Sequence, residues 1–319
     1  MDRVERDALR AWTPVRINIA QGEPTIDWAI VQRPFLEPFF EQSAYAAMDH
    51  PFNAAFGRRT SLAILDELAA GAPVAPPAGL IFHMSRCGST LVAQMLSRLT
   101  RAVVLSEPQP VDALLRLRPR LGDVLTAARL RALVEALAGR RAADGRVFVK
   151  LHAWHVLALP LFAAAFPHTP WAFVFREPRA VLRSQTRSPG AEVIAGTVDP
   201  ALLGIDARAA YTMPPDEYAA RAIRAICDGA LREAGRGRAA FVAYDTLPES
   251  AIAGLLDFFG IAVTREEAAE MRQTALLDAK SLRVPFHRPG ESTADVETER
   301  RAAALLDAPY AAMRALALR

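Results

Sequence analysis

The sequence predicts an α/β fold with three layers, α/β/α, in which a central and mainly parallel sheet lies between helices. Two observations predict this class. From residue 80 onward, short apolar runs typical of buried strands alternate with segments of helical period. Consecutive parallel strands need a crossover, usually a helix, so this alternation favours a parallel sheet covered by helices. The length of 319 residues suits one large domain or a domain with an appended module.

The elements of the main domain follow from their apolar spacing. Strands are expected at Leu80–His83, Ala102–Leu105, Arg146–Leu151, Trp171–Phe175 and Ala239–Tyr244. Between them, Leu130, Leu133, Val134 and Leu137 recur at helical spacing and predict one buried helix face. A terminal helix is expected over Glu297–Leu318. The segment Ala191–Pro215 has little periodicity, so we expect a lid or substrate loop there.

The first 75 residues are predicted to form an N-terminal extension, and residues 76–319 the main domain. Val15–Ala20 and Thr25–Val31 flank a turn-like Gln-Gly-Glu-Pro sequence and predict a hairpin. Two helices and a connector rich in proline and glycine are expected to follow, at Glu37–Met48, Ser61–Ala70 and Gly71–Gly79.

Composition excludes several classes of protein. No apolar run reaches the roughly 18–20 residues of a membrane span, and the charged start is unlike a signal peptide, so a cytoplasmic location is expected. Cys87 and Cys227 are the only cysteines, which excludes a disulfide framework and a cysteine-rich metal site. The net charge of +3 is too small to predict a nucleic-acid-binding surface.

The segment from Leu80 to Leu96 constrains the function most tightly. An apolar strand ends in a short loop that holds Arg86, Gly88, Ser89 and Thr90, and an apolar helix follows at once. Loop and helix N–H groups in such a turn converge on one point, where they bind a phosphate or a phosphate analogue. The loop is not a Walker A sequence, since its basic residue precedes the glycine. A plain strand–turn–helix with small residues for packing is the alternative interpretation.

A second candidate anion-binding element follows the strand that ends at Phe175. Arg176 stands at the strand end, Pro178 suits a first helical position, and Ser184 lies eight residues after Arg176. Arg179 and Arg183 share one face of this helix, and for them we predict a solvated basic surface.

The rarity of lysine in this chain indicates two further candidate site residues. Only two of the 38 basic residues are lysines, Lys150 and Lys280. In a chain so biased toward arginine, a lysine is plausible where a compact ammonium does what a guanidinium cannot. Chance survival of either lysine is the alternative.

Taken together, four short motifs resemble those of the PAPS-dependent sulfotransferases, which use 3′-phosphoadenosine 5′-phosphosulfate. Ser85–Thr90 resembles their 5′-phosphosulfate loop, and Arg176 with Ser184 keeps the spacing of their 3′-phosphate element. Lys150–His152 looks like their Lys-Thr-His segment. Tyr244–Leu247 resembles their Tyr-Glu-Asp-Leu segment, whose tyrosine contacts adenine. The motifs occur in family order over residues 80–260, so the resemblance implies a P-loop nucleotide-binding fold.

The chain departs from the cytosolic members in several ways. The loop lacks its opening proline, and Leu91 stands where those enzymes have an adenine-stacking tryptophan. Arg86 replaces a lysine, which looks more like the tyrosylprotein and carbohydrate branches. The family's C-terminal phosphate loop has two candidates, at Lys280–Arg283 or at Arg288–Gly290.

The resemblance implies a role for each matching residue. Residues implied to bind PAPS are Arg86, Cys87, Gly88, Ser89, Thr90, Arg176, Ser184, Tyr244 and Lys280. Lys150 would place positive charge near the transferred group. His152 and Glu107 are equal candidates for the general base, with His155 behind them.

The function expected from these motifs is transfer of the sulfuryl group of PAPS to an acceptor hydroxyl or amine. The acceptor is a small molecule, a glycan or a peptide, and neither a metal ion nor a nucleic acid is expected to take part. One alternative is an ATP-dependent P-loop kinase, and another is a non-catalytic protein that binds a nucleotide or a partner.

Overall fold

The computed structural model of the chain describes residues 9–19, 22–32, 34–70, 75–139, 145–281, 284–286 and 296–318. Its contacts divide it into two compact units. One comprises Met1–Leu80, Ala93–Leu151 and Pro160–Thr169, and the other Ile81–Val92, His152–Leu159 and Pro170–Arg319. The predicted boundary near residue 75 stays a prediction.

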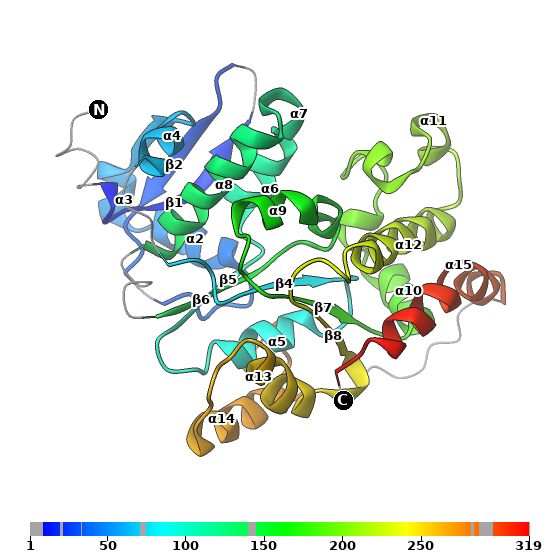
Figure 1. Cartoon of the computed structure of the whole chain (residues 1–319). Helices are drawn as coiled ribbons and strands as arrows, with labels where there is room; N and C mark the ends of the chain where they lie inside the picture. Colours follow the sequence, from blue (N-terminus) through cyan, green and yellow to red (C-terminus); the bar gives the residue numbers. More distant parts are fainter. Residues whose placement is uncertain are drawn as a thin grey trace. The chain divides into compact units, whose positions relative to one another are not determined.

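The main sheet has five parallel strands in the order β5-β6-β4-β7-β8 and is flanked by helices (Figure 1). The strands are β4 (Gly79–His83), β5 (Ala102–Ser106), β6 (Arg146–Lys150), β7 (Trp171–Phe175) and β8 (Ala239–Ala243). Every residue of β4 and β7 is buried, which explains why both read as continuous apolar runs. The α/β class and the five expected strands are confirmed.

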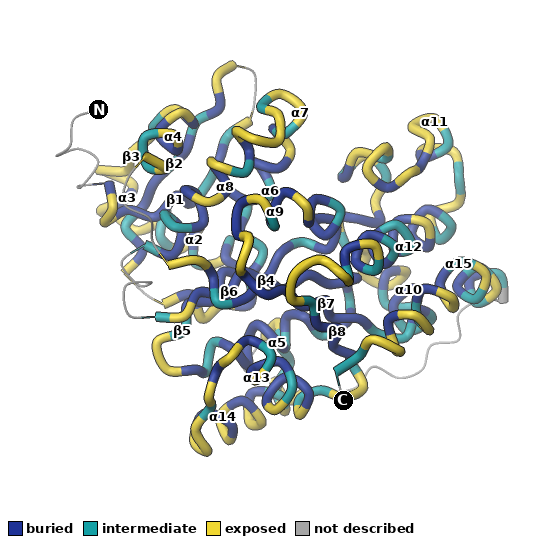
Figure 2. Tube along the Cα trace, viewed as in Figure 1, coloured by how far each residue is buried: buried dark blue, intermediate teal, exposed yellow. Residues whose placement is uncertain are grey.

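The N-terminal residues form a separate antiparallel sheet. The predicted hairpin is confirmed as β1 (Thr13–Asn18) paired with β2 (Thr25–Ala29). A third strand, β3 (Arg58–Ser61), pairs with β2 and was not predicted. Three of its four residues are exposed (Figure 2), so its sequence carries no apolar alternation. This strand forms because it pairs with β2, and not because of an apolar pattern of its own.

Helices surround these strands. Leu130, Leu133, Val134 and Leu137 are all buried on one long helix, as the spacing predicts. In the first unit the helices are α2 (Phe40–Met48), α3 (Pro51–Phe56), α4 (Ile64–Ala69), α6 (Gln109–Arg116), α7 (Arg118–Leu121), α8 (Asp123–Ala138) and α9 (Leu159–Ala165). Elsewhere they are α5 (Ser89–Leu96), α10 (Pro178–Arg187), α11 (Ala207–Ala210), α12 (Pro215–Arg232), α13 (Leu256–Phe258), α14 (Arg265–Ala275) and α15 (Val296–Ala315). None of the helices in the described ranges has the length and apolarity to cross a membrane.

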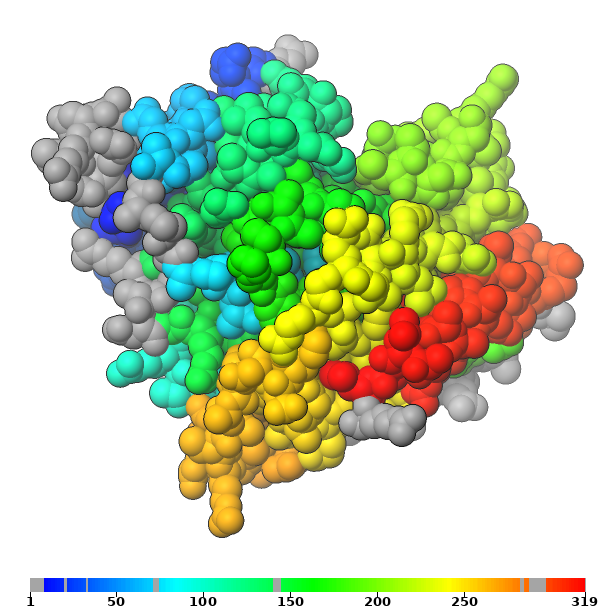
Figure 3. All heavy atoms as spheres, in the orientation of Figure 1, coloured from blue at the N-terminus to red at the C-terminus, as the bar shows by residue number. Residues whose placement is uncertain are grey.

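Within the second unit, α12 packs against both α10 and α15. In the space-filling view, the red residues of α15 lie against those of α12 (Figure 3). The segment between α10 and α12 forms short turns, at Ala191–Val193 and Pro200–Leu203, and the single turn of α11. The low periodicity of Ala191–Pro215 thus corresponds to short turns, and its role as a lid or substrate loop stays a prediction.

Candidate active site

The loop between β4 and α5 has an unusual backbone. Ser85 and Arg86 have φ values of +69° and +52°, and Gly88 has +87°. Two successive non-glycine residues with positive φ are rare and strained, and such strain gathers at functional sites. Buried hydrogen bonds hold this conformation. The Ser85 N–H donates to Nδ1 of His83 over 2.9 Å, and Nε2 of Gln185 donates to Oγ of Ser85 over 3.0 Å.

The thiol of Cys87 fastens the loop to the sheet. It is fully buried and donates to the carbonyl oxygen of Val174 on β7 over 3.0 Å. Directly after this anchor, Ser89 and Thr90 form the first turn of α5, and both are largely buried. The start of a helix carries unsatisfied N–H groups and a positive partial charge, which would stabilise an anion placed there.

Helix α10 supplies the partner of the loop's basic residue. Pro178 is its first residue, and the Glu177 carboxylate caps it by accepting from the N–H groups of residues 179 and 180. Two turns later, Oγ of Ser184 accepts a hydrogen bond of 2.9 Å from Nε of Arg86. The resemblance to sulfotransferases implied that these two residues bind different ends of the nucleotide, and the structure joins them by a hydrogen bond.

Tyr244 lies against the same loop. The guanidinium of Arg176 stands 4.3 Å from the centre of the Tyr244 ring, within cation–π range. A Cβ atom added to Gly88 would lie 2.7 Å from Cδ2 of Tyr244. The structure therefore brings Arg86, Gly88, Arg176, Ser184 and Tyr244 into one cluster, the loop cluster.

Positive charge accumulates in the loop cluster. Partial burial lowers the pKa of Arg86, and the nearby positive charges of Arg187 and Arg176 lower it further, whereas Glu192 opposes this shift. The guanidinium still stays protonated at neutral pH, because its pKa starts far above 7. A bound anion would relieve this repulsion.

Gln185 is a site residue that the sequence analysis missed. It is 3% exposed, and its Nε2 donates to Glu192 as well as to Ser85, over 3.1 Å and 3.0 Å. Its Oε1 accepts from the N–H of Gly190 over 2.7 Å. The available signal was a glutamine at position 185 on the apolar face of α10, which also carries Val181. A polar side chain on a buried helix face needs partners, and here they are the loop and the segment after α10.

Arg179 and Arg183 belong to a different network. Both pair with Glu299 on α15, over 3.1 Å and 2.8 Å, and both also pair with Glu177. Arg179 reaches Asp307 as well, over 3.2 Å. The solvated surface predicted for the two arginines is in fact a set of ion pairs between α10 and α15.

Glu107 and Lys150 lie together at the ends of β5 and β6. Their side chains form an ion pair, and the Glu107 N–H donates to the Lys150 carbonyl oxygen over 2.7 Å. The Lys150 side chain is 1% exposed, and its Nζ lies 5.2 Å from the centre of the Phe39 ring. Glu107 has a φ of +54°, a second strained non-glycine residue at a predicted position.

His152 and His155 lie close to each other, with ring centres 5.1 Å apart. His155 is fully buried and also packs edge-on against Trp154, at 4.5 Å between ring centres. His152 is partly exposed. Of the two histidines, His152 is therefore the one that a substrate can reach.

Lys280 is exposed, and its N–H donates to Oδ1 of Asp278 over 2.9 Å. Its predicted role in binding the 3′-phosphate stays a prediction. Arg283 and Arg288–Gly290, the other candidates for that loop, lie outside the described residues. The loop cluster, the Glu107–Lys150 pair and the two histidines are each well defined, and their arrangement around one substrate stays a prediction.

Comparisons with known proteins give structural matches alone. No family model matches the sequence, and no curated protein matches it significantly. The structure is similar to the sulfotransferase domain of the olefin synthase of Synechococcus PCC 7002, with 15% identity, a TM-score of 0.43 and coverage of 74% of this chain and 96% of that one. It is also similar to sulfotransferase STF9 from Mycobacterium avium, with 15% identity, a TM-score of 0.44 and coverage of 83% and 82%. For sulfotransferase STF1 from Mycobacterium tuberculosis H37Rv, the identity is 11%, the TM-score 0.40 and the coverage 78% and 82%.

The chain is thus structurally similar to bacterial sulfotransferases over most of its length. At these identities and scores the likeness carries no argument about activity, which has to come from the residues of this chain.

Proposed function

We propose that this chain transfers the sulfuryl group of PAPS to an acceptor hydroxyl or amine. The loop cluster carries the proposal. A strained loop leads into the start of α5, and the positive charges of Arg176 and Arg187 are close enough to Arg86 to lower its pKa. This combination suits a ligand with several anionic groups. PAPS has such groups at both its 5′-phosphosulfate and its 3′-phosphate.

The loop cluster and the start of α5 would bind different parts of PAPS. Backbone N–H groups of residues 85–90, with Arg86 and the hydroxyls of Ser89 and Thr90, would hold the phosphosulfate. Arg176 and Ser184 would hold the 3′-phosphate. The hydrogen bond between Arg86 and Ser184 supports a ligand that spans both elements. Tyr244, stacked on Arg176, offers an aromatic face to the adenine.

Transfer of the sulfuryl group then needs a general base and a positive charge that stabilises the negative charge developing on the transferred and leaving groups. The base takes the proton of the acceptor hydroxyl, the acceptor oxygen forms a bond to sulfur, and the bond from sulfur to the bridging phosphate oxygen breaks. Adenosine 3′,5′-bisphosphate leaves with that electron pair. The buried ammonium of Lys150 would stabilise the negative charge that develops on the bridging and sulfuryl oxygens.

Glu107 and His152 remain the two candidates for the base. Glu107 is paired with Lys150, so the carboxylate that accepts a proton would also position the ammonium. His152 is partly exposed, so an acceptor could reach its imidazole, which can accept a proton. His152→Ala and Glu107→Gln test them separately. The variant that lacks the true base should have a kcat about 100- to 10,000-fold lower than the wild type. Unchanged kcat in both variants would rule out both assignments.

Ligand stabilisation tests the proposal against the kinase and the binding-only alternatives. Adenosine 3′,5′-bisphosphate at 100 times its Kd adds about 2.7 kcal/mol of stability, which raises Tm by roughly 4 °C for a chain of 319 residues. Stabilisation by ATP with Mg²⁺ but not by the bisphosphate would favour a kinase. Stabilisation by the bisphosphate, without transfer from radiolabelled PAPS to any class of acceptor, would favour a binding protein.

A further inference from the structure

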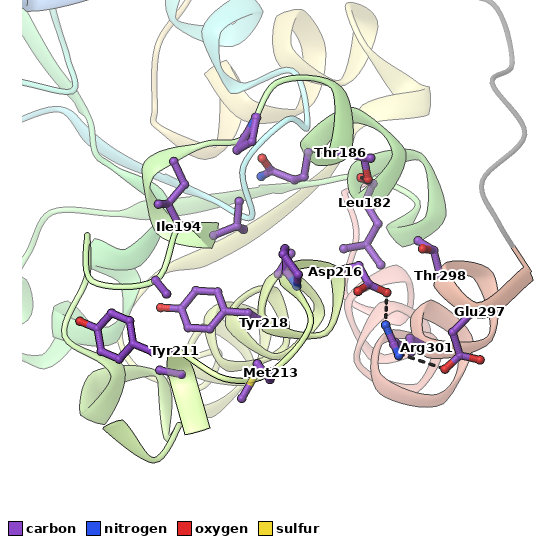
Figure 4. Close-up of a pocket in the computed structure, with 17 residues that line it drawn as sticks. Leu182, Thr186, Ile194, Tyr211, Met213, Asp216, Tyr218, Glu297, Thr298 and Arg301 are labelled. Carbon is purple, nitrogen blue, oxygen red and sulfur yellow. Dashed lines mark hydrogen bonds and ion pairs between the residues drawn. The ribbon is translucent and has the colours of Figure 1, made fainter. Parts of the chain in front are cut away.

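A pocket of about 690 Å³ lies in the second unit, beside α10 and α12 (Figure 4). Its walls come from α10, from the segment that follows it, and from the starts of α12 and α15. Mostly apolar side chains line it, among them Leu182, Pro189, Val193, Ile194, Met213 and Ala219. The volume and the lining are those of a site for a small organic molecule.

The two carboxylates of this pocket are balanced by two arginines, Arg301 in its lining and Arg300, which pairs with Glu297 over 2.9 Å. Arg301 forms an ion pair with Asp216, and its Nε lies 3.1 Å from Oε1 of Glu297; both contacts are drawn in Figure 4. An anionic ligand would meet two carboxylates and an arginine that already has partners. A cationic ligand would compete with that arginine. The pocket therefore favours an uncharged occupant.

One hydroxyl in the wall of the pocket lacks a partner. Tyr218 is 2% exposed, and its hydroxyl has no hydrogen-bond partner among the described residues. An unsatisfied buried hydroxyl costs about 1–3 kcal/mol, so buried polar groups are nearly always paired. Burial raises the pKa of Tyr218, as does Tyr211 beside it, so the phenol stays protonated and can donate. Tyr211 lines the same pocket but is 68% exposed.

We propose that this pocket binds an uncharged, largely apolar small molecule that carries one hydrogen-bonding oxygen, held by the hydroxyl of Tyr218. Gln185 connects the site to the loop cluster, because it lines the pocket and also donates to Oγ of Ser85. An occupant therefore lies against the side chain that positions the anion-binding loop. Such a molecule is either the acceptor itself or an effector that changes the loop's affinity for the nucleotide.

Binding of 2-naphthol, naphthalene and 2-naphthoate to the nucleotide-free protein tests the proposal. These probes share one ring system and differ in hydrogen bonding and charge. We expect 2-naphthol to bind most tightly and 2-naphthoate least. Tyr218→Phe should weaken 2-naphthol about three- to tenfold and leave naphthalene unchanged, while the matched variant Tyr211→Phe leaves both unchanged. Ile194→Glu, at a residue that is 48% exposed, should weaken both neutral probes by placing a charge in the apolar wall.

Two results would overturn the proposal. One is undetectable binding of 2-naphthol to the wild type, and the other is equal affinity in the wild type and in Tyr218→Phe. Tyr218→Phe removes an unsatisfied group, so its Tm should equal or exceed that of the wild type, which shows that the variant is folded.

Adding PAPS then distinguishes the two sources of the ligand. Sulfation of 2-naphthol, detected by mass spectrometry, assigns the pocket to the acceptor. A shift in the Kd of adenosine 3′,5′-bisphosphate without sulfation assigns it to an effector. The probe titrations need no nucleotide, so failure of the bisphosphate to bind would overturn the proposed function and leave the binding site standing.

Discussion

Replacing Gly88 with alanine would introduce two separate strains at the loop cluster. The new Cβ would lie 2.7 Å from Cδ2 of Tyr244 and 3.2 Å from Cδ1 of Leu247. The φ of +87° adds a backbone cost of about 1–2 kcal/mol for any residue with a Cβ. Overpacking against Tyr244 adds about 1–3 kcal/mol. We therefore expect Gly88→Ala to lower the free energy of unfolding by about 2–5 kcal/mol.

Two controls separate the strains. Gly260 has a φ of +74°, and no described atom lies within 4 Å of its added Cβ. Gly260→Ala should therefore lower the free energy of unfolding by the backbone cost alone. Adding Tyr244→Ala to Gly88→Ala removes the clash, so a double-mutant cycle should give about 1–3 kcal/mol of coupling. Urea unfolding measures Gly88→Ala, Gly260→Ala, Tyr244→Ala and the double variant. The close approach of the loop to Tyr244 would be refuted if Gly88→Ala and Gly260→Ala lowered the free energy of unfolding equally, or if the cycle with Tyr244 gave no coupling.

Three further predictions concern other parts of the structure. Gln185→Leu should lower the affinity for adenosine 3′,5′-bisphosphate about tenfold in calorimetry, because the loop loses a buried hydrogen bond; unchanged affinity would contradict a positioning role. Glu107→Gln leaves the Lys150 ammonium buried without its carboxylate and should cost about 2–4 kcal/mol in urea unfolding, part of which a second change, Lys150→Met, restores. Burial alone would raise the pKa of Asp27, but hydrogen bonds from Arg59 and Asn18, and the charges of nearby arginines, lower it overall. Asp27 therefore stabilises the fold above the ordinary carboxyl pKa and loses this effect as pH falls through its lowered pKa, so the destabilisation by Asp27→Asn should be largest near pH 7 and should shrink progressively in acid, as urea unfolding at a series of pH values would measure.

The sequence predicted the parts of the fold that apolar patterning controls. The strands of the main sheet are buried on both faces, and α8 buries the four residues whose spacing identified it. In contrast, β3 was missed because its charged, exposed residues are held by pairing with β2 and by the Arg59–Asp27 ion pair. Such pairing depends on contacts between distant residues, which local periodicity does not encode.

The candidate site shows the same division. The loop, and the start of α10 at Pro178, could be predicted because turn and capping residues are local signals. The hydrogen bond between Arg86 and Ser184 could not, since it joins residues 98 positions apart. Gln185 and Glu192 were missed for the same reason, because a buried polar side chain reveals its role only through its partners.

Calorimetric titration with adenosine 3′,5′-bisphosphate and with 5′-ADP tests the central claim most directly. The wild type should bind the bisphosphate more tightly, and Arg176→Ala should remove most of that preference, a loss of about 10- to 100-fold. Arg183→Ala, which changes a residue of the following helix α10 that is paired with Glu299, should retain it. Equal affinity of the wild type for the two nucleotides would contradict recognition of a 3′-phosphate, and with it the proposed use of PAPS.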